Sequence, residues 1–93
     1  MKIKLSNRAD RDFNEAADYI IAENPTAAQM FADQIDQVCK ILCSNPEIGK
    51  PAGRRDWRVF TMRNFRYRIF YRIDADTIII ECIFHTSQNP EKI

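Results

Sequence analysis

The apolar residues of this chain change their spacing along its length, and each spacing predicts a different element. Residues 2–5 alternate Lys, Ile, Lys and Leu, as a short strand does. Between Ser6 and Asn24 the apolar positions recur every three or four residues, which predicts a helix capped by Ser6 or Asn7. The stripe expected to face the core comprises Ala9, Phe13, Ala16, Ala17, Ile20 and Ile21. The acids expected on the solvated face are Asp10, Asp12, Glu15 and Asp18.

A second helix follows with almost no loop. Asn24 is suited to cap this helix, and Pro25 is suited to its first turn, because a backbone N–H at that position would have no partner within the helix. Its apolar positions are Ala28, Phe31, Ile35, Val38 and Leu42. Pro and Gly residues at positions 46, 49 and 51 then end this helix and open a loop that we expect to run to Arg55.

Beyond this loop the pattern becomes that of strands. Segments Trp57–Arg63, Arg66–Ile73 and Thr77–His85 are rich in β-branched and aromatic residues, and short turns separate them. The last segment is apolar on both faces, which is typical of a central strand, so the N-terminal strand is expected to pair beside it. The sequence therefore predicts an α+β fold of order β-α-α-β-β-β, with a helical hairpin on one face of a four-stranded, largely antiparallel sheet.

Alternation predicts which strand residues share a face. In the third predicted strand Tyr67, Ile69, Tyr71 and Ile73 are expected to meet the helices, leaving an open basic face formed by Arg66, Arg68, Phe70 and Arg72. In the last, one face is expected to carry Ile78, Ile80, Cys82 and Phe84, and the other Ile79 and Ile83. The face on which Arg58 lies depends on the register of the hairpin, which the sequence leaves open.

Length and composition limit the classes of protein to which this chain could belong. Ninety-three residues, 45% apolar and 29% charged, predict a single domain spanning residues 1–93. Without a long apolar run or a signal-peptide pattern, the expected location is the cytoplasm, with no membrane contact. The chain has three cysteines, Cys39, Cys43 and Cys82, an odd number that does not favour a disulfide framework. With only one histidine in the chain, a metal site is not favoured either. We therefore expect the cysteines to be thiols in the core, and we expect no cofactor.

Positive charge is concentrated in one segment. Eight basic residues against the single acid Asp56 give residues 50–72 a local charge of +7, although the whole chain carries only +1. Such a face could bind nucleic acid, bind an acidic protein segment, or be a solvated strand surface. The low total charge makes a protein partner at least as good an interpretation as nucleic acid.

Candidates for catalysis are few. His85 ends the last predicted strand, where an imidazole could act as acid or base near neutral pH, although a lone histidine at a strand end more often has a hydrogen-bonding or packing role. The sequence has neither a nucleophile–histidine pattern nor a Gly-rich phosphate loop. An enzyme is therefore the less favoured interpretation.

Stretches along nearly the whole chain carry a resemblance to a known family. The sequence resembles the RelE/ParE superfamily of bacterial toxins, specifically its ParE branch of plasmid stabilisation proteins. The matching stretches are Ser6–Asp12 with Tyr19; Asn24–Ala28 with Phe31 and Ile35; Leu42 and Asn45–Gly49; Trp57–Arg58; Tyr67–Tyr71; and Ile83–Pro90. This resemblance implies the same β-α-α-β-β-β fold that periodicity predicts.

The resemblance implies one of two activities. RelE-type toxins cleave messenger RNA on the ribosome with several basic residues, whereas ParE-type toxins act on DNA gyrase. By position, Arg68 and His85 match residues of the nuclease, whereas Val59, Thr61 and Ser87 stand where it carries cations. Since cleavage requires cations around the scissile phosphate, the resemblance favours a gyrase inhibitor.

The leading hypothesis is therefore a ParE-like toxin of a type II toxin–antitoxin system that inhibits DNA gyrase. The alternatives are a ribosome-dependent RNase using Arg68 and His85, or an inactive member of the superfamily. The resemblance also implies a cognate acidic antitoxin, ParD-like or of another kind, and a homodimer or a toxin–antitoxin hetero-oligomer. The residues expected to bind antitoxin or target are Arg58, Arg66, Arg68, Phe70, Arg72 and His85.

Overall fold

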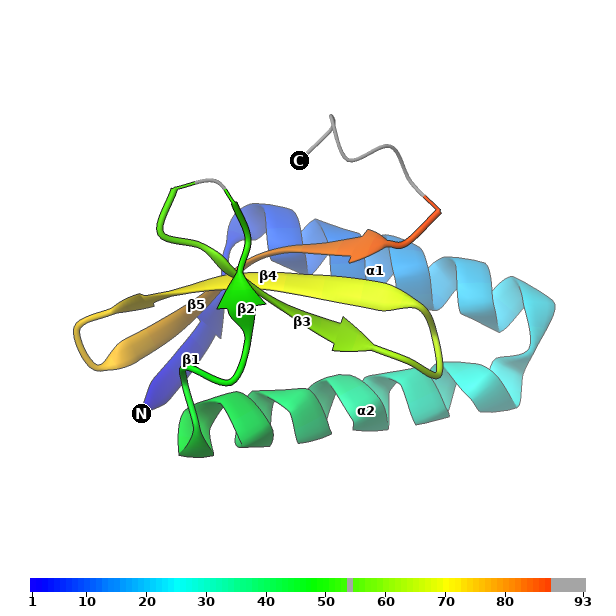
Figure 1. The fold of residues 1–93 in the computed structure, drawn as a ribbon. Helices are drawn as coiled ribbons and strands as arrows, with labels where there is room; N and C mark the ends of the chain where they lie inside the picture. The colour runs from blue at the N-terminus through cyan, green and yellow to red at the C-terminus, as the bar shows by residue number, and fades with distance from the viewer. Residues whose placement is uncertain (54, 88–93) are drawn as a thin grey trace.

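A computed structural model describes residues 1–53 and 55–87, which form two helices and five strands (Figure 1). In chain order the elements are β1 (Lys2–Leu5), α1 (Asn7–Glu23), α2 (Pro25–Ser44), β2 (Lys50–Pro51), β3 (Arg58–Met62), β4 (Tyr67–Asp74) and β5 (Thr77–His85). The sheet order is β1-β5-β4-β3-β2, in which β1 runs parallel to β5 and the other pairs are antiparallel. The predicted α+β class, the order of the two helices and the four predicted strands, and the β1–β5 pairing are confirmed.

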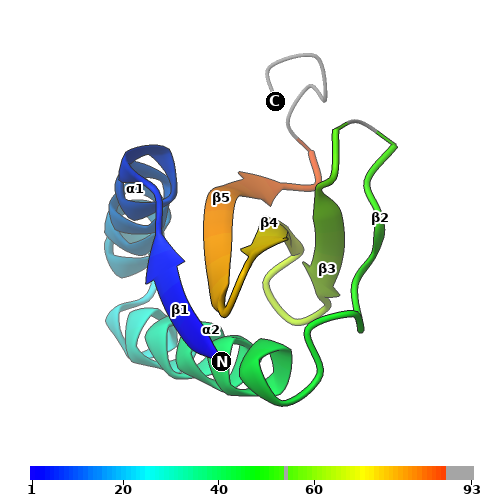
Figure 2. The ribbon, with the colours of Figure 1, turned by 90° about the vertical axis from the view of Figure 1, so that its left-hand side faces the viewer.

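Both helices lie on the same side of the sheet (Figure 2). We call the side of the sheet toward the helices the inner face and the opposite side the outer face. The expected strand count was wrong, because the loop after α2 contributes the two-residue strand β2, which pairs with Arg58 and Val59 of β3. Two residues are too few for periodicity to reveal a strand.

Side chains at the helix N-termini hold α1 and α2 in place. The Ser6 hydroxyl accepts the Ala9 N–H at 3.0 Å and donates to the Glu81 carbonyl at 2.8 Å, so it caps α1 and ties that helix to β5. Asn24 Oδ1 accepts the N–H groups of Thr26 and Ala27 at the start of α2. Both caps agree with the sequence prediction.

The main core fills the space between the helices and the inner face. Phe31 of α2 lies at its centre, fully buried, with its ring against those of Phe13, Phe65 and Tyr67. Ile35, Val38 and Leu42 continue the predicted stripe of α2. On α1 the prediction fails at Ile21, which is 50% exposed, since the helix turns it away from the sheet.

A β-bulge changes which residues of β5 share a face. Phe70 pairs with Cys82 but Tyr71 pairs with Ile80, so Glu81 is an extra residue without a partner in β4. The bulge reverses the alternation beyond it, placing Ile83 in the inner core and Cys82 and Phe84 on the outer face. The predicted grouping of Ile78, Ile80, Cys82 and Phe84 was therefore wrong.

The outer face carries an apolar cluster of its own. Phe70, Cys82 and Phe84 are each at most 6% exposed, and Ala52, Trp57 and Val59 pack against them. Arg68, Phe70 and Arg72 share this face as expected, but the face is not open at Phe70, because Ala52, Trp57 and Val59 pack against that ring. All three cysteines are thiols; Cys82 is buried, and Cys39 and Cys43 are half-buried.

Candidate functional site

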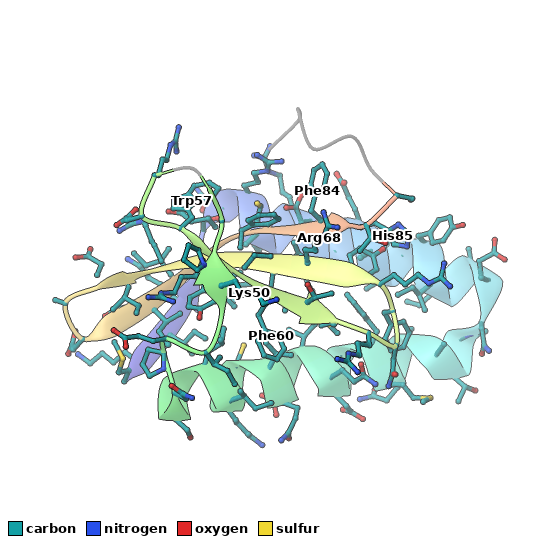
Figure 3. All side chains as sticks on the ribbon, viewed as in Figure 1. Lys50, Trp57, Phe60, Arg68, Phe84 and His85 are labelled. Atoms are coloured by element: carbon teal, nitrogen blue, oxygen red, sulfur yellow. The ribbon has the colours of Figure 1, made fainter. Side chains whose placement is uncertain are left out.

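The strand register assembles a set of cations on the outer face. Lys50 faces Val59, and Val59 faces Phe70, so Lys50 extends the row that contains the outer apolar cluster. In the next row Arg68 pairs with Thr61 of β3 on one side and with Phe84 of β5 on the other. Figure 3 labels Arg68 and Phe84 in this row. Cross-strand partners point to the same face, so Lys50 and Arg68 share it.

Arg68 is exposed, and within residues 1–53 and 55–87 it makes no ion pair. Arg55 also belongs to this face, since its guanidinium lies 5.2 Å from the centre of the Trp57 ring, and that ring packs 6.5 Å from Phe70. Lys50, Arg55 and Arg68 therefore surround the outer apolar cluster as cations available to a ligand.

Arg72 lies on the same strand but is already neutralised. Its Nε donates to Glu81 at 2.6 Å, and its Nη1 lies 3.8 Å from Asp74. The hydrogen bond with Glu81 raises the pKa of Arg72 above its usual value. Because Glu81 is the bulge residue, the bulge supplies the partner of Arg72.

Arg58 holds the loop that precedes β2. Its Nη1 donates to the carbonyls of Gly49 at 2.7 Å and Glu47 at 3.2 Å. In the same loop the Tyr71 hydroxyl donates to the Pro46 carbonyl at 2.7 Å and accepts the Gly49 N–H at 2.9 Å. Burial raises the pKa of Tyr71, which keeps this hydroxyl protonated. The structure thus gives Arg58 an internal role.

His85 lies on the other side of the sheet from Arg68. It pairs with Tyr67, and their rings meet edge to face at 5.0 Å between centroids. Tyr67 packs on Phe31 in the inner core, whereas Phe84, the partner of Arg68, belongs to the outer cluster. The Ser87 N–H donates to His85 Nδ1 at 3.1 Å, and the Ser87 hydroxyl oxygen lies 2.6 Å from the same nitrogen.

A groove opens beside His85, between α1 and the ends of β4 and β5. Its volume is about 520 Å³, and it is lined by Arg8, Asp12, Glu15, Ala16, Tyr19, Tyr67, Ile83, Phe84, His85 and Ser87. Tyr19 is 67% exposed at its rim. Burial and the nearby Tyr19 raise the pKa of Tyr67.

Asp12 shapes this groove and departs from the sequence prediction. Its Oδ2 accepts the backbone N–H of Ile83 at 3.0 Å, so it links α1 to β5 and is not merely a residue of a solvated face. A long-range contact of this kind leaves no trace in helical periodicity, because the spacing of Asp12 within α1 fits either role.

The structure separates the predicted site residues into several groups. Arg68, Phe70 and Arg72 share the outer face, although Phe70 is buried and Arg72 is paired. Arg66 lies in the β3–β4 turn and not in a strand as expected. Within the described residues no group of three or more His, Cys, Asp or Glu side chains could hold a metal ion. Residues 88–90 of the predicted tail lie outside the described residues.

Sequence reasoning missed the grouping of Lys50, Arg55 and Trp57, and also the groove with Tyr19. The register of β2 against β3 brings the first group together, and a two-residue strand gives no periodic signal. Within the part of the chain that the structure describes, no helix is both long and apolar enough to cross a membrane.

Comparison with known proteins gives this fold a family. The sequence profile of the family described as "ParE toxin of type II toxin-antitoxin system, parDE" matches residues 3–90. A candidate toxin of Sinorhizobium fredii, Y4kP, is 28% identical to this chain over 90 residues, which cover 97% of this chain and 94% of Y4kP.

Solved structures share the same architecture. A chain of the chromosomal ParDE system of P. aeruginosa superposes with a TM-score of 0.80 at 22% identity, covering 91% of this chain and 95% of its own length. A chain of the intact RelBE toxin-antitoxin complex of E. coli superposes with a TM-score of 0.63 at 13% identity. The match covers 94% of this chain and 98% of the RelBE chain. These structural similarities establish the fold, and the profile covers nearly all of the sequence. The chain belongs to the ParE family of toxins of type II toxin–antitoxin systems.

Proposed function

We propose that this toxin inhibits DNA gyrase and that an acidic antitoxin holds it inactive. The observation that carries the choice of target is the placement of Arg68 and His85 on opposite faces of the sheet. Cleavage of RNA requires an acid–base group and several cations around one phosphate. Two side chains separated by a sheet do not form such a site.

The neighbours of Arg68 support the same choice. Val59 packs in the outer apolar cluster and Thr61 stands beside Arg68, so neither position adds a cation. His85 contacts Tyr67 and Ser87, and one arginine, Arg8, lines the groove beside it. An inhibitor that acts by binding needs no acid–base geometry, and the profile match to ParE toxins is consistent with one.

A supercoiling assay tests this proposal. Antitoxin-free toxin added to purified gyrase with ATP should inhibit supercoiling and cause cleaved DNA to accumulate, because the toxin would hold the enzyme on cut DNA. In cells, the same action should induce the DNA-damage response and filamentation. Normal supercoiling at a large molar excess of folded toxin would refute the gyrase proposal.

The RNase alternative has a direct test of its own. Primer extension on translating ribosomes should reveal no cleavage at the A site, because the sheet keeps Arg68 and His85 apart. Clean cuts that disappear in His85→Ala would replace gyrase inhibition with the nuclease function.

The proposed antitoxin covers the sheet face and turn that carry Arg66, Arg68 and Arg72, and anchors apolar side chains on the helical surface. The support is the charge of residues 50–72 and the groove beside α1, with Tyr19 exposed at its rim. These features suit a segment that folds on binding.

Charge reversal at Arg68 tests this contact. Arg68→Glu should slow association with the antitoxin, most strongly at low salt, because charge steers the encounter. Arg11→Glu, an equal charge change on exposed α1, is the matched control. Equal association rates for Arg68→Glu and wild type across an ionic-strength series would exclude the electrostatic contact.

A further inference from the structure

The two layers of this protein carry opposite charge. Residues 7–44, which form both helices, contain seven acids and three bases, a net charge of −4. Residues 50–87, which form most of the sheet, contain eight bases and four acids, a net charge of +4. The total of +1 therefore conceals a polarised molecule, and a polyanion would be repelled by the helices and attracted to the sheet.

On the outer face the free cations are arranged around residues that are already packed. Lys50 and Arg68 are fixed by strand register, and Arg55 by its contact with Trp57. In the described part of the chain none of the three makes an ion pair. Arg72 differs from these three cations, because it forms ion pairs with Asp74 and Glu81.

Little apolar surface remains on this face for a protein partner to bury. Phe70, Cys82 and Phe84 are at most 6% exposed. Among the residues that the structure describes, the large apolar side chains that are exposed lie elsewhere: Met1, Tyr19, Ile21, Met30 and Ile48. An antitoxin segment that reaches this face can bury its apolar side chains in the groove beside α1, whereas the face itself offers mainly positioned cations, which are what a phosphate backbone requires.

Backbone conformation adds an independent observation. Arg55 and Arg66 have φ values of 53° and 58°, in the left-handed region where turns ordinarily use glycine or asparagine. Arg55 precedes β3, and Arg66 ends the β3–β4 turn, next to the Met62–Tyr67 pair that follows the row of Thr61 and Arg68. Ala75 shares this conformation, so strain alone marks no site. The informative feature is that both strained turns beside the outer face carry arginine.

We propose that the outer face binds the phosphate backbone of duplex DNA through Lys50, Arg55 and Arg68, with Arg66 at its border. This inference deepens the proposed function, since gyrase holds duplex DNA, and a toxin that grips that DNA would be retained on the enzyme–DNA complex. Contacts to phosphates position a protein without reading sequence. An acidic antitoxin segment over the same face would compete with DNA for these cations.

Binding of a short labelled duplex to antitoxin-free toxin, followed by fluorescence anisotropy without gyrase, tests the proposal. The affinity should fall steeply with salt, with a log–log slope of about −0.9 for each phosphate contacted. Arg68→Gln and Lys50→Gln should each weaken binding severalfold and reduce the slope by about 1. Arg11→Gln removes the same charge from exposed α1 and should change neither quantity.

Arg66→Gly separates binding from folding. Glycine adopts the left-handed conformation without steric cost, so the thermal midpoint should be unchanged or higher. Loss of the guanidinium should nevertheless weaken DNA binding. Lower stability together with unchanged binding would contradict the role assigned to this turn.

Any of the following results would overturn the proposal: no binding of duplex at low salt, equal losses for Arg68→Gln and Arg11→Gln, or saturable binding of single-stranded RNA without binding of duplex. Weakened antitoxin binding by Arg68→Gln with unchanged DNA affinity would make the face a protein interface only. Because gyrase is absent from the assay, failure here leaves gyrase inhibition to be judged by the supercoiling experiment.

Discussion

At the residue scale, Gly49 shows how one missing side chain makes room for an internal contact. A Cβ built at this position would lie 2.6 Å from the Tyr71 hydroxyl oxygen and 2.9 Å from the Val59 carbonyl oxygen. The Tyr71 hydroxyl cannot retreat without losing the carbonyl of Pro46 and the N–H of Gly49. The requirement for glycine here is therefore steric.

Substitutions at the two glycines should fail for different reasons. Gly49→Ala should lower the free energy of unfolding by about 1–3 kcal/mol through overpacking, and Gly49→Asn by more. Gly53 has φ 81° and nothing within 4 Å of the point that a Cβ would occupy, so Gly53→Ala should cost about 1 kcal/mol and Gly53→Asn less. Urea denaturation of the four variants measures this reversal; the same Ala-to-Asn order at both sites would contradict it.

At the element scale, α1 is held by its cap and by β5 together. Ser6→Ala removes the hydroxyl that binds both Ala9 and Glu81, so unfolding should become easier by about 1–2 kcal/mol. Ser6→Thr keeps the hydroxyl and should recover most of the loss. Asn7→Ala, at the exposed neighbouring position, should stay within about 0.5 kcal/mol of wild type. Chemical denaturation measures all three, and equal effects of Ser6→Ala and Asn7→Ala would disprove the cap's dual role.

The elements also mark where sequence reasoning reaches its limit. Periodicity predicted the helices, their caps and the order of the long strands, because each depends on neighbours in sequence. The bulge at Glu81 depends on how β5 meets β4, and it reversed the faces assigned to Cys82 and Ile83. The strand β2 exists only through its pairing with β3.

The candidate site was predictable in composition but not in arrangement. The basic segment and His85 were evident from the sequence, yet the sheet separates Arg68 from His85. Likewise the neutralisation of Arg72 by Glu81 and the internal role of Arg58 required the structure. Charge along a chain identifies cations, whereas their availability depends on partners distant in sequence.

At the scale of the whole molecule, one thiol and two tyrosine hydroxyls that are buried or half-buried should make stability sensitive to alkaline pH. Burial raises the pKa of Cys39 above 9.0 and the pKa values of Tyr67 and Tyr71 above 10.0. The folded state therefore holds these protons more tightly than the unfolded chain. The contribution of these groups to the free energy of unfolding is fully present below their ordinary pKa values. It is lost as the pH rises through their raised pKa values in the folded state.

Thermal unfolding from neutral to alkaline pH measures this loss. The midpoint should remain level to about pH 8.5 and then decline, because thiols and phenols ionise first in the unfolded chain. Tyr67→Phe should match wild type at neutral pH and lose less stability above about pH 10. An identical alkaline profile for the two proteins would exclude a contribution from Tyr67.

The position of β5 has a consequence for how this protein folds during its synthesis on the ribosome. β5 lies between β1 and β4, and β1, made first, pairs with residues made about 75 positions later. Until Thr77–His85 leave the ribosome, β1 and α1 have no strand on which to pack, so folding must follow translation of β5. Newly synthesised chains therefore remain without the toxin's surfaces until β5 has been made, which gives an antitoxin already present in the cell time to meet each one as it folds.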